Sequence, residues 1–129
     1  MERITISTGT PWEPVVGYAR AVRVGDVVHV AGTTAMRDGT VVAPGDAYAQ
    51  ASEALGIIVA ALAECGATPA DVVRTRIYVT DIGIWEEVGR AHGEVFADVR
   101  PASTMVQVAA LIDPDLLVEI EAEAIVGPA

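Results

Sequence analysis

Val118-Glu119-Ile120-Glu121-Ala122-Glu123-Ala124, residues 118–124, is the most regular stretch of the 129-residue chain. Apolar and acidic side chains alternate in it without a break. Because successive side chains of a β-strand point to opposite faces of the sheet, this alternation predicts a strand with one apolar and one charged face. We expect this strand to span residues 116–126 and to lie in a sheet with its core on one side.

Five further strands are predicted upstream of it. Residues 4–6 form a short alternating pattern, and residues 18–24 and 27–31 are two β-rich runs joined by Gly25-Asp26, which predicts a hairpin. Residues 72–80 are strongly strand-like, and a strand over residues 104–111 would reach the last one through Asp113-Pro114-Asp115. Within residues 72–80 we expect two faces, one with Val73, Thr75, Ile77 and Val79, the other with Arg74, Arg76 and Tyr78.

Two stretches have the period of an α-helix. Small and aliphatic residues recur every three or four positions over residues 47–62, with Asp46 suited to the start and Gly66 to the end. Asp81 could cap a second helix, which would end before Arg100-Pro101, since the residue before proline avoids helical geometry. Its expected buried stripe is Ile84, Trp85, Val88, Ala91, Val95 and Phe96.

The order of these elements predicts one α+β domain over residues 1–129, a sheet with two helices on the same face. The opposite face would carry Arg74, Arg76, Glu119 and Glu121 among apolar groups. Such a face is too polar for a core and too apolar for water. We therefore expect it to be buried against other copies of the chain in a cyclic oligomer.

The net charge of −10, with eight scattered arginines and no lysine, argues against binding to nucleic acid or anionic membranes. The single cysteine, Cys65, excludes an intrachain disulfide. We find no signal-peptide pattern and no apolar run of the ~20 residues that a membrane span needs, so the cytoplasm is the expected location. His29 and His92 lack a metal-ligand spacing and no phosphate-binding glycine loop is present, so we predict no metal and no cofactor.

Five segments, taken in order along the chain, resemble the Rid (reactive intermediate deaminase, YjgF-type) family. They are Val16-Gly17-Tyr18, Val30-Ala31-Gly32-Thr33, Arg76-Ile77-Tyr78-Val79-Thr80-Asp81, Arg100-Pro101-Ala102-Ser103-Thr104-Met105-Val106-Gln107-Val108 and Val118-Glu119-Ile120-Glu121-Ala122. The resemblance implies a chorismate-mutase-like fold and a homotrimer, in which three sheets form a barrel and ligand clefts lie between neighbouring subunits.

The resemblance also implies an activity, the hydrolysis of reactive enamines and imines such as 2-aminoacrylate to a keto acid and ammonia. By this match Glu119 positions the attacking water, Tyr18 lines the pocket and Gly32 supplies a backbone contact. The family's carboxylate-gripping arginine falls on Ser103, and Met105 and Ala31 replace its usual cysteine and serine. A cleft with Glu119, Ser103, Thr104 and Met105 suits a neutral or cationic small molecule better than a carboxylate.

Each candidate residue also has a structural interpretation. Glu119 could pair with Arg74 or Arg76, Tyr18 could pack at a subunit seam, and Trp12 could be an aromatic lid or an anchor for its loop. Thr33 could donate to a ligand. The missing charge could be supplied by Arg90, His92 or Arg100, although surface roles are the ordinary expectation for them.

Three functions are compatible with these features. The leading hypothesis is a homotrimer that binds a small metabolite and hydrolyses an imine, an enamine or a related substrate through a water held by Glu119. The second is a non-catalytic ligand-binding or sensor protein on the same scaffold. The third is the endoribonuclease or translation-inhibitor role often attached to this family, which the charge of −10 opposes.

Overall fold

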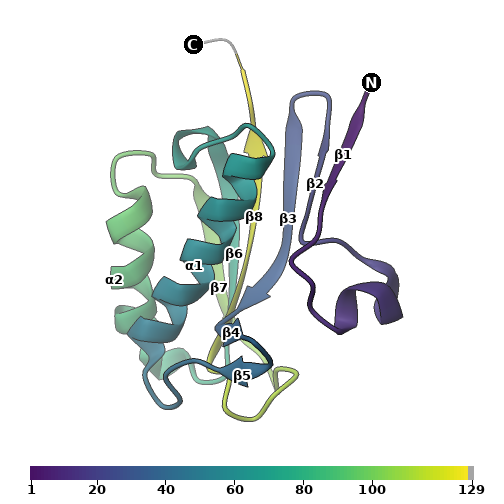
Figure 1. The fold of residues 1–129 in the computed structure, drawn as a ribbon. Helices are drawn as coiled ribbons and strands as arrows, with labels where there is room; N and C mark the ends of the chain where they lie inside the picture. Colours follow the sequence, from purple (N-terminus) through teal and green to yellow (C-terminus); the bar gives the residue numbers. More distant parts are fainter. Residues whose placement is uncertain (128–129) are drawn as a thin grey trace.

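The computed structural model describes residues 1–127. Its main elements are β1 (Arg3–Ile6), β2 (Ala21–Val24), β3 (Val27–Thr34), α1 (Ala47–Glu64), β6 (Val72–Val79), α2 (Trp85–Phe96), β7 (Ala102–Gln107) and β8 (Val118–Ile125). Two short strands, β4 (Met36–Arg37) and β5 (Thr40–Val41), pair separately. The six long strands form one mixed sheet in the order β1-β2-β3-β8-β6-β7, and both helices pack on one of its faces (Figure 1). This architecture confirms the α+β prediction.

Strand β8 lies inside the sheet, antiparallel to both β3 and β6. Val118, Ile120, Ala122 and Ala124 are buried beneath the helices, whereas the three glutamates between them are only half-buried on the opposite, open face. The alternating pattern is thus confirmed residue by residue. Strand β7 runs parallel to β6 at the edge of the sheet.

Helix α1 begins and ends where the sequence predicts. The Asp46 carboxylate accepts a hydrogen bond from the backbone N–H of Ala49 (3.0 Å), and Gly66 adopts a φ of +77° after the last turn. The helix also carries a buried polar residue, Gln50. Its amide donates to the carbonyl of Asp115 (2.9 Å) and accepts from the N–H of Leu117 (2.8 Å), which ties α1 to the chain just before β8.

Several expected details differ in the structure. Trp85, expected in the buried stripe of α2, is 56% exposed at the first position of the helix. Val73 is 43% exposed, since a register shift between Val72 and Arg74 turns it away from the core side. Strand β7 is shorter and earlier than the predicted 104–111, and β2 begins at Ala21 rather than at Tyr18.

The loop between β1 and β2 is built around one buried carboxylate, that of Glu13, at the start of a single π-helical turn (Glu13–Gly17). Glu13 is 3% exposed and accepts hydrogen bonds from Ser7, Thr8 and Thr10. Burial alone would raise the pKa of Glu13, but these hydrogen bonds outweigh it and lower the pKa from 4.5 to about 2. The loop is therefore held in place by an ionised group.

We predict that Glu13→Gln lowers the free energy of unfolding at pH 7 by about 3 kcal/mol, because the charged acceptor of several hydrogen bonds is lost. Because the pKa of Glu13 is lowered on folding, its ionised carboxylate contributes fully to the free energy of unfolding above pH 4.5. That contribution is lost as the pH falls toward 2. Urea unfolding of wild type and variant should therefore differ at pH 7 and converge near pH 2. Glu2→Gln, at an exposed position, is the control and should not change the free energy of unfolding at either pH. A difference between wild type and Glu13→Gln that stays constant from pH 7 to pH 2 would contradict the lowered pKa of Glu13.

Candidate functional site

The carboxylate of Glu119 occupies the space where a side chain at residue 32 would be. A Cβ added to Gly32 would lie 2.2 Å from Glu119 Oε2, well inside van der Waals contact. The two residues meet because β3 has a bulge between Val30 and Thr33, which brings Thr34 opposite Glu119 on β8. Glycine is therefore required at position 32 for the close approach of this carboxylate.

The environment of Glu119 favours its protonated form. Burial raises the pKa of Glu119 above its usual value, and the neighbouring Glu121 carboxylate raises it further, while Arg20 acts in the opposite direction. A carboxyl group whose pKa is moved toward neutrality is suited to accept and return a proton. Among the candidate residues, Glu119 thus has the electrostatics of an acid–base group.

A buried arginine, Arg20, supports this part of the site. Its guanidinium donates to the carbonyl of Gly32 (2.7 Å) and to Thr33 Oγ1 (3.0 Å), and it lies 3.9 Å from the Glu13 carboxylate. Thr33 is itself buried and donates to the carbonyl of Ala31 (2.8 Å), so its hydroxyl proton is directed to the backbone rather than to a ligand. Arg20 therefore fixes the bulge that carries Gly32.

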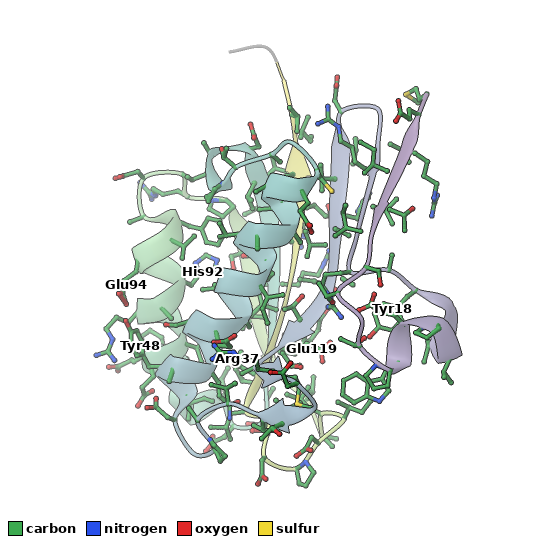
Figure 2. All side chains as sticks on the ribbon, in the orientation of Figure 1. Tyr18, Arg37, Tyr48, His92, Glu94 and Glu119 are labelled. Atoms are coloured by element: carbon green, nitrogen blue, oxygen red, sulfur yellow. The ribbon has the colours of Figure 1, made fainter. Side chains whose placement is uncertain are left out.

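Tyr18 lines a cavity of about 640 Å³ on the open face of the sheet, whose other walls include His29, Ala31, Arg76 and Glu121. The Tyr18 ring lies 5.6 Å from the guanidinium carbon of Arg20. Glu119 and Gly32 do not line this cavity. Trp12 is half-buried immediately before the π-helical turn, and Figure 2 shows Tyr18 beside that turn.

The other two glutamates of β8 are engaged in side-chain contacts. Arg76 forms salt bridges with Glu121 (3.4 Å) and Glu123 (2.8 Å), and the Tyr78 hydroxyl donates to Glu121 (2.9 Å). Glu119 is absent from these pairs, so the alternative in which Arg74 or Arg76 neutralises it has no support among the ion pairs of residues 1–127.

Within the chain, the sheet separates Ser103 from Glu119. In the parallel pair of β6 and β7, Ser103 lies opposite Thr75 and Met105 opposite Ile77, both of which face the helices. Thr104 lies opposite Arg76 and shares the open face with Glu119. Ser103 and Met105 therefore point to the helix side, and only Thr104 is on the same side as the carboxylate.

The Ser103 hydroxyl instead takes part in a hydrogen bond on the helix side of the sheet. Thr75 Oγ1 donates to Ser103 Oγ (2.8 Å) and lies 2.8 Å from His92 Nε2 on α2. His92 packs on the ring of Phe96, with 4.7 Å between ring centroids, and burial lowers its pKa. Figure 2 shows His92 on α2, at the opposite side of the picture from Tyr18.

The other charged candidates lie elsewhere. The Arg90 guanidinium stacks on Tyr48, 4.1 Å from the ring centroid, and thus belongs to the outer surface of the helices. Arg100 is exposed, with a φ of +55°, directly before Pro101. In residues 1–127 no cluster of three His, Cys, Asp or Glu side chains could hold a metal ion, and no helix is long and apolar enough to cross a membrane.

The sequence analysis missed two contributors, Arg20 and Thr75. Arg20 was grouped with the scattered arginines, and its burial follows from the Glu13 loop, which has no strand or helix periodicity. Thr75 was placed on the core side of its strand but given no role. A polar residue on an otherwise apolar face, as Thr75 is between Ile77 and Val72, is the signal that could have identified it.

We predict that Gly32→Ala displaces the Glu119 carboxylate, because the methyl group and Oε2 cannot occupy the same space. The side chain can rotate away, so we expect the fold to persist, with a loss of stability of about 1 kcal/mol. Carboxyl NMR should show the Glu119 resonance shifted and its titration moved toward that of an exposed glutamate. Gly56→Ala, whose added Cβ meets nothing within 4 Å, is the control and should leave Glu119 unchanged. An unmoved Glu119 signal in Gly32→Ala would disprove the contact.

Comparison with known proteins is consistent with this geometry. The sequence profile described as Endoribonuclease L-PSP matches residues 8–126. The crystal structure of Rv2704 from Mycobacterium tuberculosis, a member of the YjgF/YER057c/UK114 family, aligns with a TM-score of 0.89 and 54% identity over 97% of this chain and all of that one.

Two curated relatives match along nearly their whole length. An uncharacterized protein of Streptomyces coelicolor is 43% identical over 95% of this chain and 91% of its own. The 3-aminoacrylate deaminase RutC of Acinetobacter baylyi is 32% identical over 95% of this chain and 97% of its own. With the profile match over residues 8–126, these similarities show that the chain belongs to the YjgF-type (Rid) family.

Proposed function

We propose that this protein is a homotrimer that binds a small, uncharged or cationic metabolite in clefts between its subunits. In each cleft Glu119 holds a water molecule that hydrolyses an imine or enamine bond of the ligand. The observation that carries this proposal is the Glu119 carboxylate, wedged against Gly32 and raised in pKa by burial. The relative named 3-aminoacrylate deaminase is consistent with a reaction of this type.

The proposed chemistry needs one group that can take up and release a proton. Glu119 accepts a proton from water while the hydroxide oxygen forms a bond to the carbon of the C=N group. Transfer of that proton to the nitrogen completes a carbinolamine. A second proton then moves from the carbinolamine hydroxyl to the nitrogen, the C–N bond breaks and the C=O bond forms, so that imine and water give a carbonyl compound and ammonia. A carboxyl group with a raised pKa can perform both transfers near neutral pH.

The charge of the site bears on the class of substrate. In the motif Pro101-Ala102-Ser103-Thr104-Met105 every side chain is uncharged. Arg20, whose charge lowers the pKa of Glu119, is already bound to the Gly32 carbonyl, Thr33 and Glu13. A carboxylate substrate would therefore meet Glu119 without a free cation to bind it, which favours a neutral or cationic ligand.

The trimer is supported by the open face of the sheet. Val106 and Val73 are exposed there or at its edge, and the Nε atom of Arg74 is buried without a hydrogen-bond partner among residues 1–127. A second copy packed on this face would cover the valines. Since Ser103 and Glu119 lie on opposite faces of one sheet, a cleft that contains both would combine two protomers.

The ribonuclease role in the profile's description receives less support. The chain carries a charge of −10, and the walls of the open-face cavity contain three carboxylates, Glu13, Glu121 and Glu123, against two guanidinium groups, Arg3 and Arg76. A polyanion would be repelled by this surface. A non-catalytic binding protein remains the second candidate, since Ser103 removes the positive charge expected from the family resemblance.

We predict that wild-type protein turns over enzymatically generated 2-aminoacrylate poorly and that Ser103→Arg increases kcat/KM by about 30- to 1000-fold, because a charged bidentate donor stabilises the substrate carboxylate. Ammonia release measures the rate. Ser103→Met, long but uncharged, is the control and should not gain activity.

Glu119→Ala in the Ser103→Arg background should abolish the gained activity. Rapid turnover of 2-aminoacrylate by wild type would contradict the proposed preference for uncharged substrates. Activity that survives Glu119→Ala would contradict the role of the carboxylate, and ligand binding without any turnover would favour the sensor hypothesis.

We also predict a sedimentation mass of about 40 kDa, three times the 13.4 kDa of the chain. Val106→Glu, on the open face, should convert this species to monomers, because it buries an unpaired charge in the interface. Ala60→Glu, an equally acidic change at an exposed position of α1, should leave the mass unchanged. A monomeric wild type would remove the basis for the intersubunit cleft.

A further inference from the structure

The hydrogen-bond chain from His92 through Thr75 to Ser103 has no part in the chemistry proposed for Glu119. It crosses three elements, α2, β6 and β7, and each of its two links measures 2.8 Å. It ends at Ser103, an exposed residue in the motif that the proposed function places at the cleft.

The middle member of the chain has little freedom. Thr75 has no exposed surface, so its hydroxyl cannot exchange its partners for water. A hydroxyl group has one proton and two lone pairs, and the two groups within reach of Thr75 Oγ1 at its open end are Ser103 Oγ and His92 Nε2. If Thr75 donates to Ser103, His92 must donate to Thr75; in the opposite arrangement Ser103 donates inward.

The environment of His92 favours the outward arrangement, in which His92 donates to Thr75 and Thr75 donates to Ser103. Burial lowers the pKa of His92, so its ring is neutral and a single nitrogen carries the proton. Because the Nε2–H tautomer is the more stable form of neutral histidine in water, we expect Nε2 to donate to Thr75, which directs the Thr75 proton to Ser103. The ring is held in this orientation by its packing on Phe96, which is buried.

An outward chain leaves the Ser103 proton free and fixes the direction in which it can point. One of the two lone pairs of Ser103 Oγ accepts the Thr75 proton, and the Ser103 proton is available to donate to a ligand. Successive hydrogen bonds polarise one another and strengthen the terminal donor by roughly 10–30% per bond. Such a donor is neutral, and it matches an uncharged acceptor such as a carbonyl or amide oxygen.

We infer that Thr75 and His92 are positioning residues which make the Ser103 hydroxyl a fixed hydrogen-bond donor to a neutral carbonyl or amide group of the ligand. This inference rests on the proposed function for its ligand, but the hydrogen-bond chain itself is testable without one.

The first experiment is nitrogen-15 NMR of the histidine side chains in the folded protein. Wild type should show His92 with a protonated Nε2 and an unprotonated Nδ1. Thr75→Val keeps the shape of the side chain and removes its hydroxyl, so the His92 signals should shift and Nε2–H should exchange faster with solvent, while Thr75→Ser should restore both. A proton on Nδ1, or signals unaffected by Thr75→Val, would overturn the relay.

The second experiment measures the binding of pyruvamide, a neutral carbonyl compound, and of pyruvate, its anionic counterpart. Wild type should prefer pyruvamide. Thr75→Val should weaken pyruvamide binding by about fivefold to tenfold, the effect of one hydrogen bond, with no change for pyruvate. His92→Gln, which can place an N–H near the position of Nε2, should retain more affinity than His92→Leu.

The two experiments fail in different ways. An intact outward relay without pyruvamide binding would overturn the assignment of carbonyl ligands and weaken the proposed function. Pyruvamide binding that is unaffected by Thr75→Val would overturn the positioning role and leave the proposed function standing. Circular dichroism of each variant confirms that an observed loss does not come from unfolding.

Discussion

One face of β8 must be shielded from water, and the charges on its other face must be compensated; the other elements of the molecule provide both. On one face, valine, isoleucine and alanine side chains exclude water beneath α1 and α2. On the other, three carboxylates stand in a row on the same strand, where their mutual repulsion must be offset. Arg76 offsets two of them by salt bridges, and the pKa of the third, Glu119, is raised instead.

This division of roles gives the candidate site its character. Glu121 and Glu123 are paired, while Glu119 lies in the space left by Gly32, where burial and the charge of Glu121 favour its protonated form. The bulge that opens this space is fixed by Arg20, and Arg20 contacts the buried Glu13. The acid–base group is thus supported by a second carboxylate, that of Glu13 in the loop between β1 and β2, which is ionised at neutral pH.

The fold could be predicted in large part because its signals are local. Alternation identified β8, the helical period identified α1, and Asp46 and Gly66 marked its ends. Predictions failed where the position of a residue depends on a neighbouring element. Trp85 has the spacing of a buried residue but lies at the helix start, and the register shift after Val72 turns Val73 outward, which a strict period of two cannot represent.

For the site, sequence patterns were enough to identify which chemical groups are present: a glutamate on an alternating strand, a glycine in the hairpin and an uncharged motif around Ser103. The patterns could not determine the relations between these groups, since the relations cross from one element to another. These relations are seen only in the folded chain, where Glu119 lies against Gly32, Ser103 faces the helices through Thr75 and His92, and Arg20 is buried. Proximity and burial arise when separate segments pack, and they set the pKa and hydrogen bonds of each group in ways that no local pattern encodes.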